Sequence, residues 1–219
     1  MDDAEERYRD ILEGLATYFA SPFVADILAT VSRFDAPDLG ASLNRGQMSS
    51  KVWLADALAT HAGAQFGTVT VLGGWFGVLA AILLADRRLA IRRVISVDRD
   101  PRCAPVARSM NASSGERFDA VTADMLSLPY AVPHPGGGPP DLLVNTSCEH
   151  LPDFASWFRR VPDGQLVALQ SNDYFAVDEH VNCVPDLAAF RAQAPMSELL
   201  FAGARAQKKY TRFMLLGRK

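Results

Sequence analysis

Short runs of β-branched and apolar residues alternate with helical segments from residue 68 onward, and this alternation constrains the fold more than any other feature. Five such runs occur in order, at residues 68–72, 93–98, 119–124, 141–145 and 165–170. Strands separated by helices form parallel sheets through right-handed crossovers. The sequence therefore predicts an α/β fold with a Rossmann-like sheet.

Two further strand-like runs, residues 198–206 and 210–216, break this alternation near the carboxyl end of the chain. Only Gln207, Lys208 and Lys209 join them. So short a link cannot hold a crossover helix, so the two strands should pair antiparallel. We therefore expect a seven-stranded sheet that ends in an antiparallel hairpin.

The first 64 residues show no strand alternation and are expected to form an N-terminal helical cap, followed by a ligand-binding domain over residues 65–219. Ile11, Leu15 and Tyr18 recur at three- and four-residue steps, which is typical of one apolar helix face. A later helix is expected to begin with Ser49 or Ser50 as its N-cap.

Composition limits the classes of partner that the protein can bind and the cellular compartment that suits it. The net charge of −3 disfavours nucleic acid as a partner, because nucleic acid needs a basic face. A short cap without an accessory domain favours a small-molecule substrate. The longest apolar stretch, near residues 78–85, is too short to span a membrane. Three distant cysteines and an acidic N-terminus suit a reducing cytoplasm. No Cys or His cluster at ligand spacing appears, so no metal is expected.

A glycine loop joins the first strand to the following helix, with Gly73, Gly74 and Gly77 in it. Glycine lets a backbone turn tightly and approach a ligand closely. Asp98 ends the second strand about twenty residues later, where a carboxylate can accept hydrogen bonds from ribose hydroxyls. Asp124 ends the third strand, and Met125 follows it, where they would meet an adenine. These features indicate an adenosine-containing ligand at the carboxyl edge of the sheet.

The order of helical cap, glycine loop, two strand-end acids and terminal hairpin resembles the class I S-adenosylmethionine-dependent methyltransferases over roughly residues 65–219. The resemblance implies S-adenosylmethionine as cofactor. The loop glycines would line its amino-acid part, Asp98 its ribose and Asp124 its adenine.

This loop departs from the family pattern, because Leu72 stands where an acidic residue is usual and Trp75 and Phe76 lie between the glycines. A nicotinamide dinucleotide is the competing ligand for such a loop. It fits less well, because its pattern is Gly-x-Gly-x-x-Gly and its sheet lacks the terminal hairpin.

Candidate catalytic and substrate-binding residues follow the fourth and fifth strands. Asn145 would hold a polar group, and Glu149 or His150 would act as a base, unless they only begin a helix. After the fifth strand come Ser171, Asn172, Tyr174 and Phe175. The rings of Tyr174 and Phe175, with those of Trp75 and Phe76, would attract a sulfonium or else fill a lid interface. Lys51 would pair with the cofactor carboxylate, unless it is solvent-exposed.

Three functions remain open at this point. Methyl transfer to a small acceptor is the first. The second is cyclisation of S-adenosylmethionine to azetidine-2-carboxylic acid with release of methylthioadenosine, because the sequence is similar to the small bacterial azetidine-2-carboxylate synthases in its glycine-aromatic loop and residues 170–175. The third is a catalytically inactive partner subunit that binds through Phe201, Tyr210 and Phe213.

Overall fold

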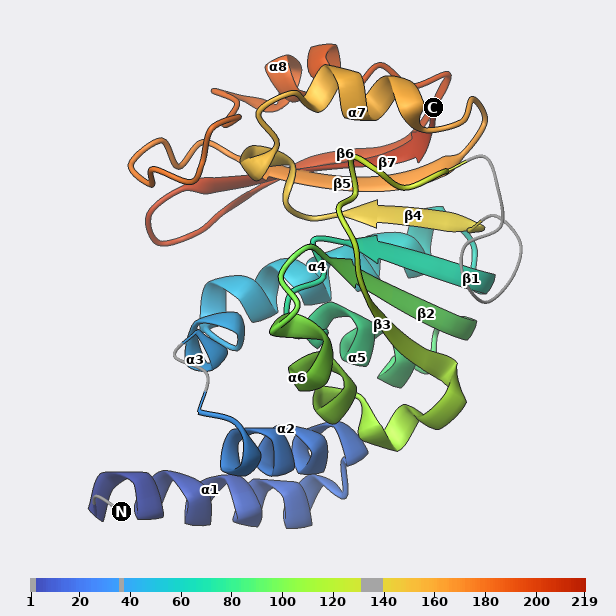
Figure 1. Ribbon diagram of the computed structural model, residues 1–219. Coiled ribbons are helices and arrows are strands. Elements are labelled where there is room, and N and C mark those ends of the chain that lie inside the picture. The colour runs from blue at the N-terminus through green and yellow to red at the C-terminus, as the bar shows by residue number, and fades with distance from the viewer. Residues whose placement is uncertain (1–2, 36–37, 131–139) are drawn as a thin grey trace.

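A seven-stranded sheet of order β3-β2-β1-β4-β5-β7-β6 forms the centre of the protein, in a computed structural model that describes residues 3–35, 38–130 and 140–219 (Figure 1). The first five strands in sequence pair in parallel, whereas β7 lies antiparallel between β5 and β6. The strands are β1 Gln65–Leu72, β2 Ala90–Asp98, β3 Phe118–Thr122, β4 Leu142–Asn145, β5 Leu166–Asn172, β6 Glu198–Ala206 and β7 Thr211–Arg218. The predicted fold class is confirmed.

Burial on both faces explains why the central strands read as continuous apolar runs. In β4, Leu142 and Val144 join the core on one face of the sheet, and Leu143 joins the core on the other. In β5, Ala168 and Val167 divide in the same way. Helices cover both faces, and the polar residues of β4 and β5 lie at the carboxyl ends of these strands.

Eight α-helices and two short 3-10 turns surround the sheet within the described residues. They are α1 Asp3–Phe19, α2 Pro22–Arg33, α3 Leu39–Ser42, α4 Arg45–His61, α5 Val78–Ala85, α6 Cys103–Met110, η1 Ala112–Arg117, η2 Cys148–His150, α7 Phe154–Arg160 and α8 Leu187–Gln193. Side chains of α4, α5 and α6 belong to one core, and those of α7 and α8 to the other. None of the described helices is long and apolar enough to cross a membrane.

Helix α4 begins at Arg45, and its N-cap is Asn44, whose side chain accepts a hydrogen bond of 2.9 Å from the Gln47 amide. The prediction of Ser49 or Ser50 as N-cap is therefore wrong. Ser50 instead lies inside the helix and donates to Gln170 of β5 over 2.9 Å. The sequence alone does not distinguish a serine that hydrogen-bonds to a neighbouring strand from a serine that caps the N-terminus of its own helix.

The N-terminal helices contribute unequally to the core. Leu54 and Leu58 of α4 are fully buried with residues of the sheet. Helix α1 lies at the periphery against α2, and Ile11 and Tyr18 on it are 58% and 82% exposed (Figure 1). The apolar stripe of α1 thus forms a helix whose face is only partly covered. The division of the chain at residue 64 stays a prediction.

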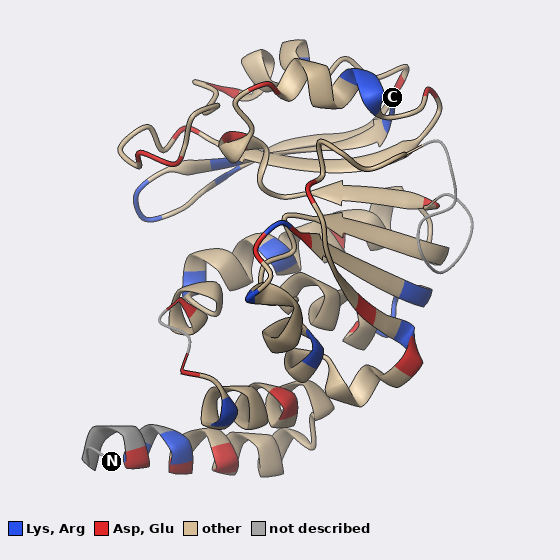
Figure 2. Ribbon diagram, viewed as in Figure 1, with Lys and Arg blue, Asp and Glu red and all other residues tan. Residues whose placement is uncertain are grey.

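Charged residues of both signs are interspersed over the surface in the view of Figure 2. Basic residues mark the turn between β6 and β7, where Lys208 and Lys209 lie. Acidic residues occur in the loop after β5, which contains Asp178 and Glu179.

Candidate functional site

The loop between β1 and α5 is held tightly against its neighbours. Gly73 and Gly77 have φ angles of +60° and +74°, which favour glycine. A Cβ at Gly74 would lie 2.0 Å from the Ser96 Oγ, and the Gly74 amide donates to the Val97 carbonyl over 3.0 Å. Glycine at these positions therefore serves close approach to β2 as well as the turn itself.

Trp75 and Phe76 inside this loop stack on each other, with ring centroids 5.1 Å apart. Phe76 is buried in a cluster with Leu39 and Val106, and Trp75 packs against the same cluster. Partly buried apolar residues of α2 complete it. The two rings thus connect the loop to the N-terminal helices. Trp75 has a φ of +49°, which is strained for a residue with a side chain. Packing of Trp75 against this cluster has to offset the cost of that strain.

Asp98 lies at the end of β2 and braces the glycine loop. Its Oδ2 accepts a hydrogen bond of 2.9 Å from the Trp75 amide, and its Oδ1 accepts one of 3.0 Å from the Asp100 amide. The residue is partly exposed, so each oxygen can still accept a hydrogen bond from a ligand hydroxyl. Asp98 therefore lies where the sequence analysis expected a ribose.

Asp124 and Met125 follow β3 in a turn. The Asp124 Oδ1 accepts from the Leu126 amide over 2.8 Å. The Met125 Sδ lies 3.6 Å from the Asn145 Nδ2, and its Cε would be 3.5 Å from a Cβ at Gly73. Met125 thus reaches the ends of β1 and β4.

The carboxyl ends of β1 and β4 adjoin each other at the point where the chain order in the sheet reverses. Open α/β sheets bind ligands in the crevice outside such a reversal. Asn145 at the end of β4 is fully buried, and its Oδ1 accepts from the Ser147 amide over 2.9 Å. A Cβ at Gly73 would lie 2.8 Å from the Ser147 Oγ. Gly73, Met125 and Asn145 are therefore brought together as predicted neighbours of one ligand.

A buried polar cluster lies at the carboxyl ends of β4 and β5. The Arg212 Nη1 and the Glu149 Oε1 form an ion pair of 2.6 Å, with both side chains at most 5% exposed. The Asn172 Nδ2 donates to the same Glu149 oxygen over 2.7 Å. The Glu149 Oε2, the Arg212 Nε and the Ser171 Oγ have no hydrogen-bond partner among the described residues.

Arg212 was missed by sequence reasoning. It is the second residue of a strand that is otherwise largely apolar. A charged residue in such a strand is the only sign in the sequence that could have indicated a buried arginine. Its partner Glu149 and its neighbour Asn172 were predicted as candidates, although not as partners of each other.

Lys51 of α4 is buried, in contrast to the solvent-exposed alternative. Burial, reinforced by the charge of Arg212, lowers the pKa of Lys51 from 10.5 to about 7. Its amine donates to the Gln47 Oε1. A buried amine that is half-charged at neutral pH is suited to bind a carboxylate or to accept a proton.

We expect Lys51→Met to change how stability depends on pH. Between about pH 7 and 10.5 the unfolded chain binds more protons at Lys51 than the folded chain does, so the stability of the wild type rises with pH there. The free energy of unfolding of Lys51→Met should exceed that of the wild type by more at pH 7 than at pH 9. The difference between the two pH values should be about 2 kcal/mol. Urea unfolding of both proteins at each pH measures it, and a constant difference would contradict the assigned pKa.

His150, His180 and Tyr174 lie close together beside the buried polar cluster that contains Glu149. The two imidazole rings are 4.7 Å apart in an edge-to-face arrangement, and the ring of Tyr174 is 6.0 Å from that of His180. Tyr174 stacks on Tyr210, whereas Phe175 is 62% exposed. His150 lies in η2, and α7 begins only at Phe154, so the expectation that residues 149–150 begin that helix is wrong.

The three cysteines are structural. Burial raises the pKa of Cys103 to about 12 and that of Cys183 to about 11, and it raises the pKa of Cys148 well above its usual range. A thiol with a raised pKa is a poor nucleophile at neutral pH. Cys103 and Cys148 are buried and Cys183 is partly buried, so packing is the role that their positions support.

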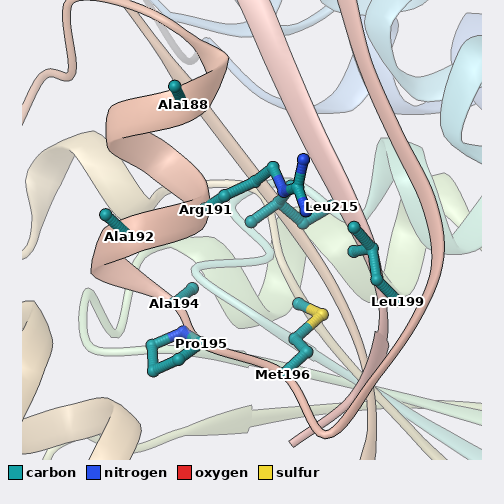
Figure 3. A pocket seen from close by; sticks show the side chains of 8 residues that line it. All are labelled: Ala188, Arg191, Ala192, Ala194, Pro195, Met196, Leu199 and Leu215. Carbon is teal, nitrogen blue, oxygen red and sulfur yellow. The ribbon is translucent and has the colours of Figure 1, made fainter.

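A cavity of about 380 Å³ lies away from these residues, between α8 and the β6–β7 hairpin (Figure 3). Apolar side chains line most of it, and Arg191 is its one charged lining residue. None of the predicted site residues lines it, and it holds no acid and base together. We therefore assign the candidate site to the carboxyl edge of the sheet and not to this cavity.

Comparisons with known proteins support the fold. No protein-family model matches the chain, and no curated protein matches it in sequence. Among solved structures, the N-methyltransferase NodS from Bradyrhizobium japonicum WM9, in complex with S-adenosyl-L-homocysteine, is similar with a TM-score of 0.62 and 12% identity, over 89% of this chain and 99% of that one. The cyclase SpnF has a TM-score of 0.59 and 12% identity, over 90% and 92% of the two chains.

A variant of MtNAS in complex with S-adenosylmethionine is similar over 100% of this chain and 80% of that one, with a TM-score of 0.57 and 13% identity. Likeness at such low identity concerns the fold. The chain therefore has the class I methyltransferase fold, which the sequence analysis expected.

Proposed function

We propose that this protein binds S-adenosylmethionine at the carboxyl edge of β1, β2 and β4 and uses it in a reaction on a small molecule. The observation that carries the proposal is the Asp98 carboxylate, which is hydrogen-bonded to the glycine loop beside the reversal of strand order. Bound ligands of this kind in the similar structures of NodS and MtNAS support it.

The residues present fit the proposed cofactor. A hydrogen-bond acceptor for the ribose is available at Asp98, and glycine at position 73 lets the loop backbone lie close to Ser147 and Met125. Met125 would move aside or cover the adenine, since a methionine side chain is flexible and polarizable. When bound, the sulfonium supplies an electrophilic carbon. The protein would align the nucleophile with that carbon and manage one proton.

Methyl transfer to a small acceptor is the first candidate reaction. Glu149 favours it, because one oxygen of this buried carboxylate is free among the described residues to accept a proton or a hydrogen bond from an acceptor. Arg212 forms an ion pair with Glu149 and balances its charge in this buried place. Asn145 and His150 would orient the acceptor.

Cyclisation to azetidine-2-carboxylic acid is the second candidate, and Lys51 is the observation that favours it. The amine of the cofactor's amino-acid arm would lose a proton and attack the γ-carbon, while the carbon–sulfur bond breaks and methylthioadenosine leaves. A lysine with a pKa of about 7 can accept that proton at neutral pH. Arg212 lies near Lys51 and would hold the carboxylate.

The inactive-subunit reading has less support. Phe213 is buried, Phe201 packs on Trp53 and His61, and Tyr210 stacks on Tyr174. These rings are engaged inside the chain and offer little surface to a partner.

One incubation separates the two reactions. The purified protein is mixed with S-adenosylmethionine alone, and the products are identified by mass spectrometry. Methylthioadenosine together with the azetidine acid supports cyclisation and excludes methyl transfer as the main reaction. S-adenosylhomocysteine that forms only when a small acceptor is added supports methyl transfer. Because S-adenosylmethionine also decays without enzyme, a sample with Asp98→Ala serves as the background.

Replacement of Asp98 tests the binding site itself. We expect Asp98→Ala to weaken S-adenosylmethionine binding by about 1.5–3 kcal/mol, because the charge-assisted hydrogen bonds to the ribose are lost. Isothermal titration calorimetry measures the effect. Asp163→Ala is the matched control, since Asp163 is exposed and pairs only with Lys219 in the described part of the chain. Equal affinity for Asp98→Ala and the wild type would remove Asp98 from the site.

A further inference from the structure

Glu149, His150 and His180 form a compact group of three potential metal ligands. Each offers one ligand atom, and these atoms lie within 4.8 Å of one another. Glu149 and His150 come from η2, whereas His180 comes from the loop after β5. No spacing in the sequence reveals this group, because the fold alone brings His180 to the other two residues.

Each of the two imidazoles has a backbone carbonyl beside one ring nitrogen, as many metal-binding histidines do. The His150 Nδ1 lies 3.0 Å from the Glu179 carbonyl oxygen, and the His180 Nδ1 lies 2.9 Å from the Tyr174 carbonyl oxygen. A carbonyl oxygen can only accept, so each Nδ1 must carry the proton. In the neutral ring the Nε2 lone pair is then free, and a backbone carbonyl on the other nitrogen is the usual support of a ligand histidine.

Glu149 supplies an independent observation. Its side chain is 3% exposed, and its Oε1 accepts hydrogen bonds from Asn172 and Arg212. Its Oε2 is buried and has no hydrogen-bond partner among the described residues. A buried carboxylate oxygen without a partner is costly, so it indicates a cation or a donor that completes the site.

We propose that Glu149, His150 and His180 bind one divalent transition-metal ion. Two imidazoles and one carboxylate are the ligands of catalytic zinc sites and of non-haem iron sites, and they leave positions open for water or for a nitrogen or oxygen donor of a small molecule. Ligand atoms bound to one such ion lie roughly 3–3.6 Å apart. His150 is exposed, so a small tilt of its ring can close the remaining gap while its Nδ1 keeps the hydrogen bond to the Glu179 carbonyl.

Two expectations about the ion follow from its surroundings. The charge of Arg212 beside Glu149 opposes a second cation, so the site should bind more weakly than a closed structural zinc site. Magnesium and calcium prefer oxygen ligands, so neither should compete well for two imidazoles. The inference does not depend on S-adenosylmethionine binding.

Zinc titration tests the site. Protein without an affinity tag is freed of metal with a chelator, exchanged into plain buffer and titrated with zinc chloride in a calorimeter. We expect one zinc ion per chain, no comparable binding of magnesium, and an affinity at least about tenfold lower in His180→Ala and in His150→Ala. His61→Ala is the matched control, because His61 stacks on Phe201 outside the group, and its zinc affinity should equal that of the wild type.

Two results of these variant titrations would overturn the proposed metal site. Zinc affinity in His180→Ala equal to that of the wild type would overturn the site, as would an equal loss in His61→Ala. Circular dichroism of each variant shows whether it is folded, and a Glu149 variant is avoided because it would also break the ion pair. S-adenosylmethionine binding is measured on the same samples in chelator. A protein that binds S-adenosylmethionine but not zinc overturns the metal site and leaves the proposed function standing.

Discussion

Arg212→Met should lower the free energy of unfolding by about 3–5 kcal/mol, the cost of leaving one member of a buried ion pair without the other. Glu149 would keep only Asn172 as a hydrogen-bond partner among the described residues, in a place where its side chain is 3% exposed. Urea unfolding measures the loss as a shift of the midpoint at unchanged slope.

The double variant Glu149→Gln with Arg212→Met is the control for this result. It removes both charges together and keeps an oxygen that can accept from Asn172. Replacement of both members of a buried ion pair is often close to neutral, so the double variant should lie within about 2 kcal/mol of the wild type. If the double variant were no more stable than Arg212→Met, the loss would come from the volume of Arg212 and not from the isolated charge of Glu149.

The second large effect is expected at Gly77. Its φ of +74° costs a residue with a side chain about 1–2 kcal/mol. A Cβ there would also lie 2.7 Å from the Asn111 Nδ2 and 3.1 Å from the Ala107 Cβ. Crowding of this kind adds about 1–3 kcal/mol, so Gly77→Ala should lose roughly 2–5 kcal/mol in total.

Gly164→Ala separates the two causes. Gly164 has nearly the same φ, +78°, but a Cβ there would meet no described atom within 4 Å. We expect Gly164→Ala to lose only about 1–2 kcal/mol, in the same unfolding measurement. Equal losses in the two variants would show that α6 does not press against the glycine loop as closely as the structure indicates.

The fold was predictable because the strongest signals in the sequence are local and redundant. Strands buried on both faces must be apolar where they cross the core, as β4 and β5 are before the polar residues at their carboxyl ends. The short link between β6 and β7 leaves antiparallel pairing as the only arrangement. The start of α4 was not predictable in this way, since Asn44 and Ser50 are equally good capping residues and only Ser50's bond to Gln170 distinguishes them.

The site was predictable only in part, for a different reason. Asp98, Asn145 and Asn172 stand at strand ends, so the topology alone puts them on one edge. Arg212 and His180 reach the same edge through a hairpin and a loop, whose paths are set by tertiary contacts. Phe76 was predicted to face the ligand but is buried in a core cluster. The sequence alone does not show which way an aromatic ring in a ligand-binding loop faces.

Helix α4 contacts its near neighbours α3 and α5 and also a hairpin that is synthesised much later, β6 and β7. Its side chains contact β6 and β7, and Ser49 exchanges a hydrogen bond with Gln207 over 3.2 Å. β7 itself must insert between β5 and β6 before that surface exists. Contacts so distant in sequence carry a large loop-closure cost and slow folding. On the ribosome, part of the apolar face of α4 therefore stays uncovered until the β6–β7 hairpin has emerged, and such exposed apolar surface is prone to aggregation.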